Sequence, residues 1–446
     1  MKYVAVGLGC LVLVLATIRP ALCGPSEPKY ALRSHRDAGQ IDRVAVILEF
    51  NGNFSGPADG KQAATPTNGT DRLTYYEKTL RAGQKLGSVR YYEKAEADTL
   101  TKDRPHRESL HEAHQLVGVA VDLPLATIFS LRQPLSRDEL ELIDILGNTL
   151  LLDRLLPQEA VAVGDQWKPP DDVMAALLGL DGATSCDVQC TLKEVTPRVA
   201  RFELAGTVEG PVNDTSSHIE IKGRYRLDRS KGRIDWFALV TSERRELSEV
   251  AEAFRVAARL QTVITPLVTS PQLTDERLEG LSLEPTPEQR KLSYQSPEGH
   301  WRIGYDRRWF PTGETATSAT LKLIDHQSFG AQCNIFSLPR REGVGRLELK
   351  EFQADVKKVL GREFGEFVDA KGSTDKTGRR VLRVVVEGVA HVSHDDSTPT
   401  IPIRWIYYHI SDSQGRQVAM TFAIEQRLVE RFADADKAIV ESLRFE

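Results

Sequence analysis

The sequence predicts an α+β protein with two domains, a curved antiparallel sheet with helices followed by an α/β/α sandwich that also contains an antiparallel sheet. Polar and apolar residues alternate through many short segments, which is typical of half-buried strands. A smaller number of segments repeat apolar residues at helical spacing. A stretch rich in Pro, Thr and acids at 269–291 separates two such regions in a chain of 446 residues, long enough for two or three cores.

The N-terminus has the pattern of an export signal. An almost uninterrupted apolar run over 3–18 ends at Pro20, and it is short for a membrane span. We predict a signal peptide at 1–23, with cleavage before Gly24. Lipidation of Cys23 ranks second, because Pro20 and Leu22 stand where such sites prefer Leu and a small residue, and an uncleaved anchor ranks third. The protein is therefore expected to be exported, periplasmic or secreted, with no transmembrane segment after cleavage.

The remaining boundaries follow from composition. Residues 24–40 are a polar spacer, residues 41–268 form the first domain, 269–291 the linker and 292–446 the second domain. Within the first domain, Val44, Val46 and Leu48 alternate along a strand that is followed by a long Gly/Pro/Asn/Thr-rich loop at 52–71. Further strands are predicted at 73–80 and 88–95, and the charged run at 99–114 is ambiguous.

One helix is predicted over 136–157. Ser136 and Glu139 have the spacing of a capping box, and Leu140, Ile143, Leu146 and Leu150 recur at helical spacing. A second, short helix is predicted over 171–180, with two acids at its start.

The stretch Ser185-Cys-Asp-Val-Gln-Cys190 reads as a core strand. Cys186 and Cys190 share a face with Val188, and four residues along a strand span roughly 13 Å, too far for a disulfide. No second Cys or His pair completes a zinc site. Together with Cys333, the mature chain has an odd number of thiols, and we expect buried structural thiols.

The most regular hairpin lies at 217–241, with a turn at 228–232 and one charged face. Residues 250–266 fit a helix or a strand. In the second domain, the same alternation predicts strands at 300–305, 319–324, 332–338, 380–392, 401–410 and 417–424. Amphipathic helices are predicted at 347–360 and 427–443.

Residues 292–446 resemble the PsbP/DcrB-like family. The likeness lies in "YQSPEGHWRIGYDRRWFP", in "LKEFQADVKKVLG", in the strands "IPIRWIYYHI" and "RQVAMTFAI", and in the closing helix. The resemblance implies an α/β/α sandwich and a role as an accessory or assembly factor, with no catalytic residues carried over. Residues 41–268 are similar in pattern to LolA-like lipoprotein carriers, which implies a curved antiparallel sheet covered by helices.

No complete catalytic constellation is present. His391 and His394, with Asp395 and Asp396, include metal-ligand types but occupy a predicted hairpin loop. "HRESLHEAH" at 106–114 misses the spacing of H-E-x-x-H, and "HQSFG" at 326–330 lacks the first Gly of a nucleophile elbow.

We therefore predict no catalytic, cofactor-binding or metal residues and no cofactor. A net charge of −5 with scattered basic pairs argues against nucleic acid. The expected function is an exported, non-catalytic binding or assembly factor. It would hold an apolar ligand or an envelope protein segment in a dry pocket lined by the Cys186 or Ile219 face. The alternatives are a metal-dependent hydrolase centred on His391 and His394, and a structural interaction protein.

Overall fold

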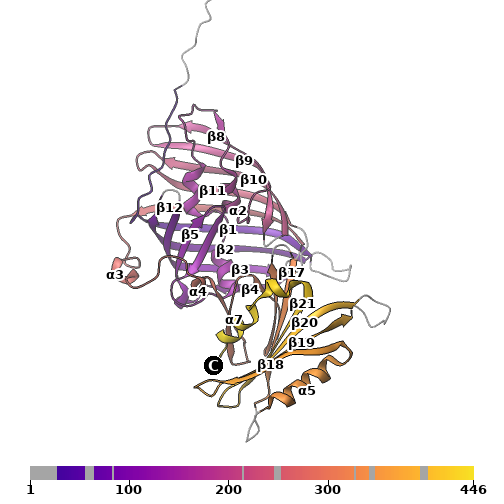
Figure 1. Cartoon of the computed structure of the whole chain (residues 1–446). Coiled ribbons are helices and arrows are strands. Elements are labelled where there is room, and N and C mark those ends of the chain that lie inside the picture. Colours follow the sequence, from indigo (N-terminus) through magenta and orange to yellow (C-terminus); the bar gives the residue numbers. More distant parts are fainter. Residues whose placement is uncertain are drawn as a thin grey trace, which may run out of the picture.

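The computed structural model describes residues 28–55, 65–82, 85–212, 215–245, 253–325, 328–340, 347–391 and 400–446. The fold is mostly β, with 56% of residues in strands and 17% in helices, so the α+β prediction is wrong. Two segments expected to be long helices, 136–157 and 427–443, are broken, whereas the helix predicted over 347–360 is present at 349–360. Of the undecided segment 250–266, residues 253–266 lie within a strand and 250–252 lie outside the described residues. Figure 1 shows the two large antiparallel sheets, one above the other.

The first sheet has twelve strands in the order β6-β5-β3-β2-β1-β12-β11-β10-β9-β8-β7, with β4 paired to β3. β1 and β12 pair in the middle of this order, so the first and last strands of the region lie side by side. The strands are β1 (Ile41–Ser55), β2 (Thr65–Arg81), β3 (Leu86–Thr101), β4 (Arg104–Ser109), β5 (Leu116–Asp122), β6 (Leu125–Ser130), β7 (Gln166–Trp167), β8 (Ser185–Val195), β9 (Val199–Val212), β10 (Thr215–Asp228), β11 (Arg233–Arg245) and β12 (Ala253–Leu267).

The alternation of side chains gives this sheet two distinct faces. The inner face carries Val44, Val46 and Leu48 of β1, all buried, and it is covered by α1 (Arg137–Ile143), η2 (Thr149–Leu155) and α2 (Asp171–Leu178). The outer face carries the intervening residues and is largely exposed. The hydroxyl of Tyr225 and the indole N–H of Trp167 both donate to the carbonyl of Leu155, at 2.9 Å each, and fix η2 on the inner face.

The helix expected over 136–157 is broken. Its capping box is present as predicted, with Ser136 and Glu139 satisfying each other's backbone N–H groups. However, α1 ends at Ile143, and Gly147 adopts a φ of 82° at a place where a Cβ would lie 2.3 Å from Leu260 Cδ2. A residue with a left-handed φ cannot continue a right-handed helix, so the chain turns at Gly147 and continues as the 3-10 helix η2. Glycine suits this position, because an L side chain there would be strained and would meet Leu260. The second predicted helix is confirmed as α2, which Gly179 ends at a φ of 72°.

The cysteine stretch and the long hairpin are confirmed. Cys186 is half-buried and Cys190 is fully buried in β8, both on the inner face, and Cys333 is buried in the second sheet. All three thiols are free. β10 and β11 form the hairpin, with the turn at 229–232.

The second large sheet has seven strands in the order β15-β16-β17-β21-β20-β19-β18, and a small sheet follows the order β13-β14-β22. Their bounds are β13 (Leu292–Gln295), β14 (Trp301–Tyr305), β15 (Trp309–Glu314), β16 (Ser318–Asp325), β17 (Ser328–Leu338), β18 (Phe364–Thr374), β19 (Arg380–His391), β20 (Thr400–Ser411), β21 (Gln417–Glu425) and β22 (Arg444–Phe445). α5 (Leu349–Leu360) packs beside β18 and β19, as Figure 1 shows.

The closing helix predicted over 427–443 is also broken. It is split into η4 (Gln426–Leu428), α6 (Val429–Phe432) and α7 (Ala435–Ser442). Ala433, with a φ of 47°, interrupts it, since a left-handed residue cannot continue a right-handed helix.

The two large sheets are joined by direct contacts. Arg137 of α1 donates to the backbone carbonyls of Arg307 and Trp309 at 2.6 and 3.0 Å, and its guanidinium lies 4.4 Å from the centre of the Phe310 ring. The predicted linker contains α3 (Asp275–Leu278) and α4 (Pro287–Arg290), and the ion pair of Lys78 with Asp275 attaches α3 to β2.

None of the described helices combines the length and apolar character needed to cross a bilayer.

Candidate binding surfaces

The histidines considered as metal ligands are not brought together in the described part of the chain. His391 ends β19 opposite Thr400 and is half-exposed. His394, Asp395, Asp396 and His326 lie outside the described residues. Within the described ranges no group of three or more His, Cys, Asp or Glu side chains could hold a metal ion.

The histidines of 106–114 have carboxylate partners. His106 in β4 lies 2.8 Å from Glu108, and His114 in η1 (Glu112–His114) lies 2.7 Å from Glu139. Glu139 also caps α1, so His114 fastens η1 to that helix. His106 and His114 therefore have structural partners at the protein surface.

The inner face expected to line a dry pocket is a packed core. Val188, Cys190 and Ile219 are buried in one continuous hydrophobic cluster, together with Leu151 and Leu155 of η2. Close-packed interiors of this kind leave few voids larger than a water molecule. The candidate binding surfaces described below lie elsewhere.

A buried ionic network stands among these apolar side chains, and sequence reasoning did not find it. Glu77 of β2 accepts hydrogen bonds from Arg90 Nε at 2.8 Å, Thr149 Oγ1 at 2.7 Å and Ser88 Oγ at 3.0 Å. Arg36 reaches the same carboxylate at 3.6 Å. Buried ions need partners and hydrogen bonds of this kind to be tolerated.

The network continues on both sides of Glu77. Arg36 Nε lies 2.9 Å from Asp153 of η2, and Arg233 of β11 pairs with Asp42 of β1. Three arginines, Arg36, Arg90 and Arg233, therefore face three carboxylates, those of Asp42, Glu77 and Asp153.

Burial and charge act against each other on these carboxylates. Burial would raise the pKa of Glu77, but Arg90 and Arg36 together hold that pKa below its usual value. Burial raises the pKa of Asp42 despite the opposing effect of Arg233. The ionised Glu77 therefore links Arg36 to Arg90 within the network.

Residues 28–40, which the sequence places in a polar spacer, form a strap across the end of the first sheet. Tyr30 pairs with Val161, the His35 N–H donates to the Gly232 carbonyl at 2.8 Å, and the Gly39 N–H donates to Thr79 at 2.7 Å. The side chain of Leu32, within the strap, is buried against the first sheet domain. Arg36 anchors the strap in the ionic network.

A cationic groove of about 490 Å³ lies between the strap and two turns of the sheet. It is lined by Ala31, Leu32, Arg33, His35, Pro197, Leu227, Arg229, Ser230, Lys231 and Gly232. The basic side chains are exposed, whereas Leu32 and Leu227 are buried. The groove therefore has a basic rim over an apolar floor.

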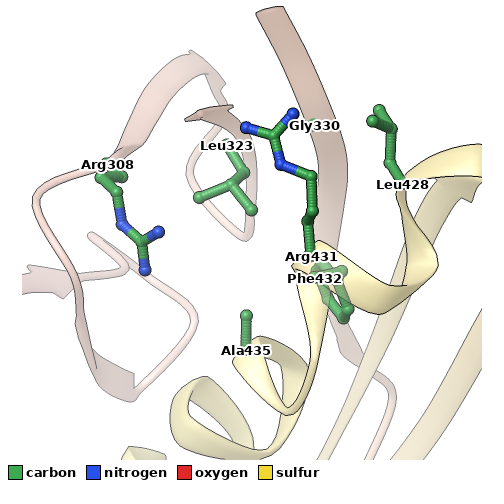
Figure 2. Close-up of a pocket in the computed structure, with 7 residues that line it drawn as sticks. All are labelled: Arg308, Leu323, Gly330, Leu428, Arg431, Phe432 and Ala435. Carbon is green, nitrogen blue, oxygen red and sulfur yellow. The ribbon is translucent and has the colours of Figure 1, made fainter. Parts of the chain in front are cut away.

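The second domain has a much smaller pocket, of about 20 Å³, which can hold little more than one water molecule. Figure 2 shows Arg308 and Arg431 on opposite sides of it. Leu323 and Phe432 supply apolar walls, and Arg308 pairs with Asp306 at 2.9 Å. Its size leaves no room for a larger ligand.

The outer face of the first sheet carries an exposed apolar strip at its centre. Across β11, β12 and β1 the register places Trp236 beside Val263 and Ala45, then Ala238 beside Gln261 and Ile47, then Val240 beside Arg259 and Glu49. The exposed fraction is 45% for Ile47, 52% for Val240 and 39% for Val263. We call the six apolar residues of these rows the outer strip: Ala45, Ile47, Trp236, Ala238, Val240 and Val263.

Basic residues border the outer strip on one side. Arg259 lies in its last row, and Arg255 lies opposite Arg244 two rows further along. Among the described residues these three arginines form no ion pair, whereas Arg224 on the same face pairs with Glu203 at 3.1 Å. The connection at 246–252 lies outside the described residues.

Comparisons with known proteins do not identify the chain. No family model and no curated protein matches it. A solved structure titled "lipid-protein interactions in lipovitellin" has a TM-score of 0.32 at 7% identity and covers 54% of this chain, which spans 26% of that chain. The outer membrane protein OprD from Pseudomonas aeruginosa has a TM-score of 0.12 at 10% identity, covering 88% of this chain and 95% of its own. OpdH from the same organism has a TM-score of 0.12 at 8% identity, covering 87% and 96%.

Likenesses at these scores carry no argument about this fold or its function. These solved structures are unrelated to the PsbP/DcrB-like and LolA-like families, so both of those resemblances stay predictions.

Proposed function

We propose that this chain is an exported, non-catalytic binding factor of the cell envelope that docks an acidic, apolar-bearing segment of a partner protein on the outer strip. The observation that carries the proposal is the outer strip itself. Its three exposed residues, Ile47, Val240 and Val263, are connected by the partly exposed Ala45, Trp236 and Ala238 across three neighbouring central strands. Contiguous apolar patches on a protein surface mark interaction sites, whereas isolated exposed apolar residues do not.

The chemistry of the partner follows from the border of the strip. Arg259, Arg255 and Arg244 offer three guanidinium groups. On the neighbouring strands the same rows add the ammonium group of Lys222 and the carboxylates of Glu49 and Glu220, so the described residues leave an excess of positive charge. Carboxylates of a partner would pair with the arginines while its apolar side chains cover the strip. Export is supported by the signal-like pattern of residues 1–23.

Site-specific photo-cross-linking tests the proposal. A photoreactive residue is placed at 240 or 263 in the full chain, in its cells of origin, and at 268 as the matched control. Val268 is 97% exposed but lies beyond the strip, immediately after the end of β12. We expect one envelope protein to be cross-linked from 240 and 263 and not from 268. Cross-links only to the chain itself, or the same products from all three positions, would contradict the proposal.

A further inference from the structure

The cationic groove suggests a second binding site, for a small molecule. Arg33 and His35 extend from the strap, and Arg229 and Lys231 from the β10–β11 turn, so basic groups face the groove from two walls. No Asp or Glu is among the described residues that line it. The whole chain carries a net charge of −5, so this local excess of positive charge runs against the composition of the protein.

The internal contacts of these basic groups leave donors available. Arg229 Nη1 donates to the Thr196 carbonyl at 2.6 Å, and the guanidinium lies 5.7 Å from the centre of the Tyr30 ring, which holds the side chain in place. Arg33 makes one long bond, from Nη2 to the Gln158 carbonyl at 3.4 Å. Each guanidinium has five N–H donors in a planar fork, so both retain groups for a ligand.

The nearest carboxylate is occupied by the turn itself. Asp228 Oδ1 accepts from the hydroxyl of Ser230 at 2.6 Å and from the N–H groups of Ser230 and Lys231 at 2.9 and 3.2 Å. The Lys231 ammonium lies 3.9 Å from the other oxygen, at the limit of an ion pair. The ammonium group is therefore only weakly neutralised.

We infer that the groove binds a phosphate-type oxyanion, held between Arg33 of the strap and Arg229 and Lys231 of the turn. Guanidinium groups match the oxygens of phosphate in paired hydrogen bonds, and an ammonium group adds a point charge. Leu32 and Leu227 in the floor are almost fully buried and offer a ligand little apolar surface, so the site suits the anionic group rather than a long apolar chain. The source of the oxyanion is free phosphate or the headgroup of an anionic phospholipid.

The variant Arg33→Gln/Lys231→Gln tests the site. Both side chains are exposed, so the variant is expected to fold. The matched control is Lys350→Gln/Lys358→Gln, which removes the same charge from exposed positions on α5, away from both the groove and the outer strip. Inorganic phosphate is titrated by calorimetry at fixed ionic strength, and phosphatidylglycerol and phosphatidylcholine vesicles are compared by co-sedimentation.

We expect saturable binding that weakens about fivefold for each cation removed from the groove and stays unchanged in the control. Binding of inorganic phosphate identifies a free oxyanion as ligand, and binding only of phosphatidylglycerol vesicles identifies a lipid headgroup. Absence of binding in both arms, or equal weakening in the control variant, would overturn the inference. The outcome is independent of the outer strip, which neither groove residue borders.

Discussion

The substitution Glu77→Gln tests the buried ionic network most sharply. The Glu77 carboxylate, almost fully buried, accepts three hydrogen bonds of 2.7–3.0 Å and faces both Arg36 and Arg90. Glutamine has nearly the same shape but no charge, so it leaves two buried guanidinium groups with one carboxylate fewer. Breaking a buried ion pair by removing one partner costs about 3–5 kcal/mol, and we expect a loss of that size in the free energy of unfolding.

The matched control is Glu93→Gln. Glu93 lies on the outer side of the neighbouring strand and pairs with Arg43 at 3.3 Å, and both side chains are largely exposed. Exposed pairs contribute about 0–1 kcal/mol. Urea denaturation followed by circular dichroism at pH 7 measures both variants, and equal small losses would refute the stabilising role of the network.

The pH dependence of the same experiment has a defined sign. The pKa of Glu77 is lowered in the fold, so its contribution is fully present above the unfolded value and is lost as pH falls through the folded value. We therefore expect the deficit of Glu77→Gln relative to the wild type to shrink as the pH is lowered below the ordinary range of glutamate. A deficit that stays constant down to pH 3 would contradict this linkage.

Two further substitutions test other parts of the fold. Burial, with Glu108 nearby, raises the pKa of Asp71 to about 6. The wild type therefore loses stability as the pH rises from about 4 to 6. We expect Asp71→Asn to be more stable than the wild type at pH 7.5 but not at pH 4. Denaturation at both pH values measures this, and equal stability at pH 7.5 would contradict it. Gly147→Ala places a methyl group 2.3 Å from Leu260 at a positive φ and should cost about 2–4 kcal/mol. Gly179→Ala, also at positive φ but with no atom within 4 Å of the new methyl group, should cost only about 1 kcal/mol in the same assay, and equal costs would contradict the packing argument.

Local patterns predicted the local structure well. Alternation placed Cys190 and Val188 on the buried face of β8, and the spacing of Ser136 and Glu139 predicted the capping box that starts α1. These features depend on neighbours within a few residues, which a single sequence displays directly.

The helix lengths could not be obtained in the same way. The apolar residues of 136–157 fit one helix because Leu140 and Leu150 serve the same core from two separate elements. The break depends on the approach of Gly147 to Leu260, which is distant in sequence. The α+β prediction was wrong partly for this reason.

The candidate sites depend on still longer-range contacts. Asp42 and Arg233 are separated by 191 residues, and the groove joins the strap to a hairpin turn that lies far along the chain. Of the candidate surfaces, only the outer strip has a signal in the local sequence, because Ile47 is apolar on the face opposite Val46 and Leu48.

The measurement that tests the central claim most directly is the affinity of the cross-linked envelope protein, once purified, for the variant Ile47→Thr/Val240→Thr/Val263→Thr. Threonine keeps the strand preference while removing apolar surface, so the variant should fold like the wild type. We predict that it binds the partner at least tenfold more weakly, while the control Val268→Thr binds as the wild type does. Wild-type affinity of the triple variant would contradict docking on the outer strip.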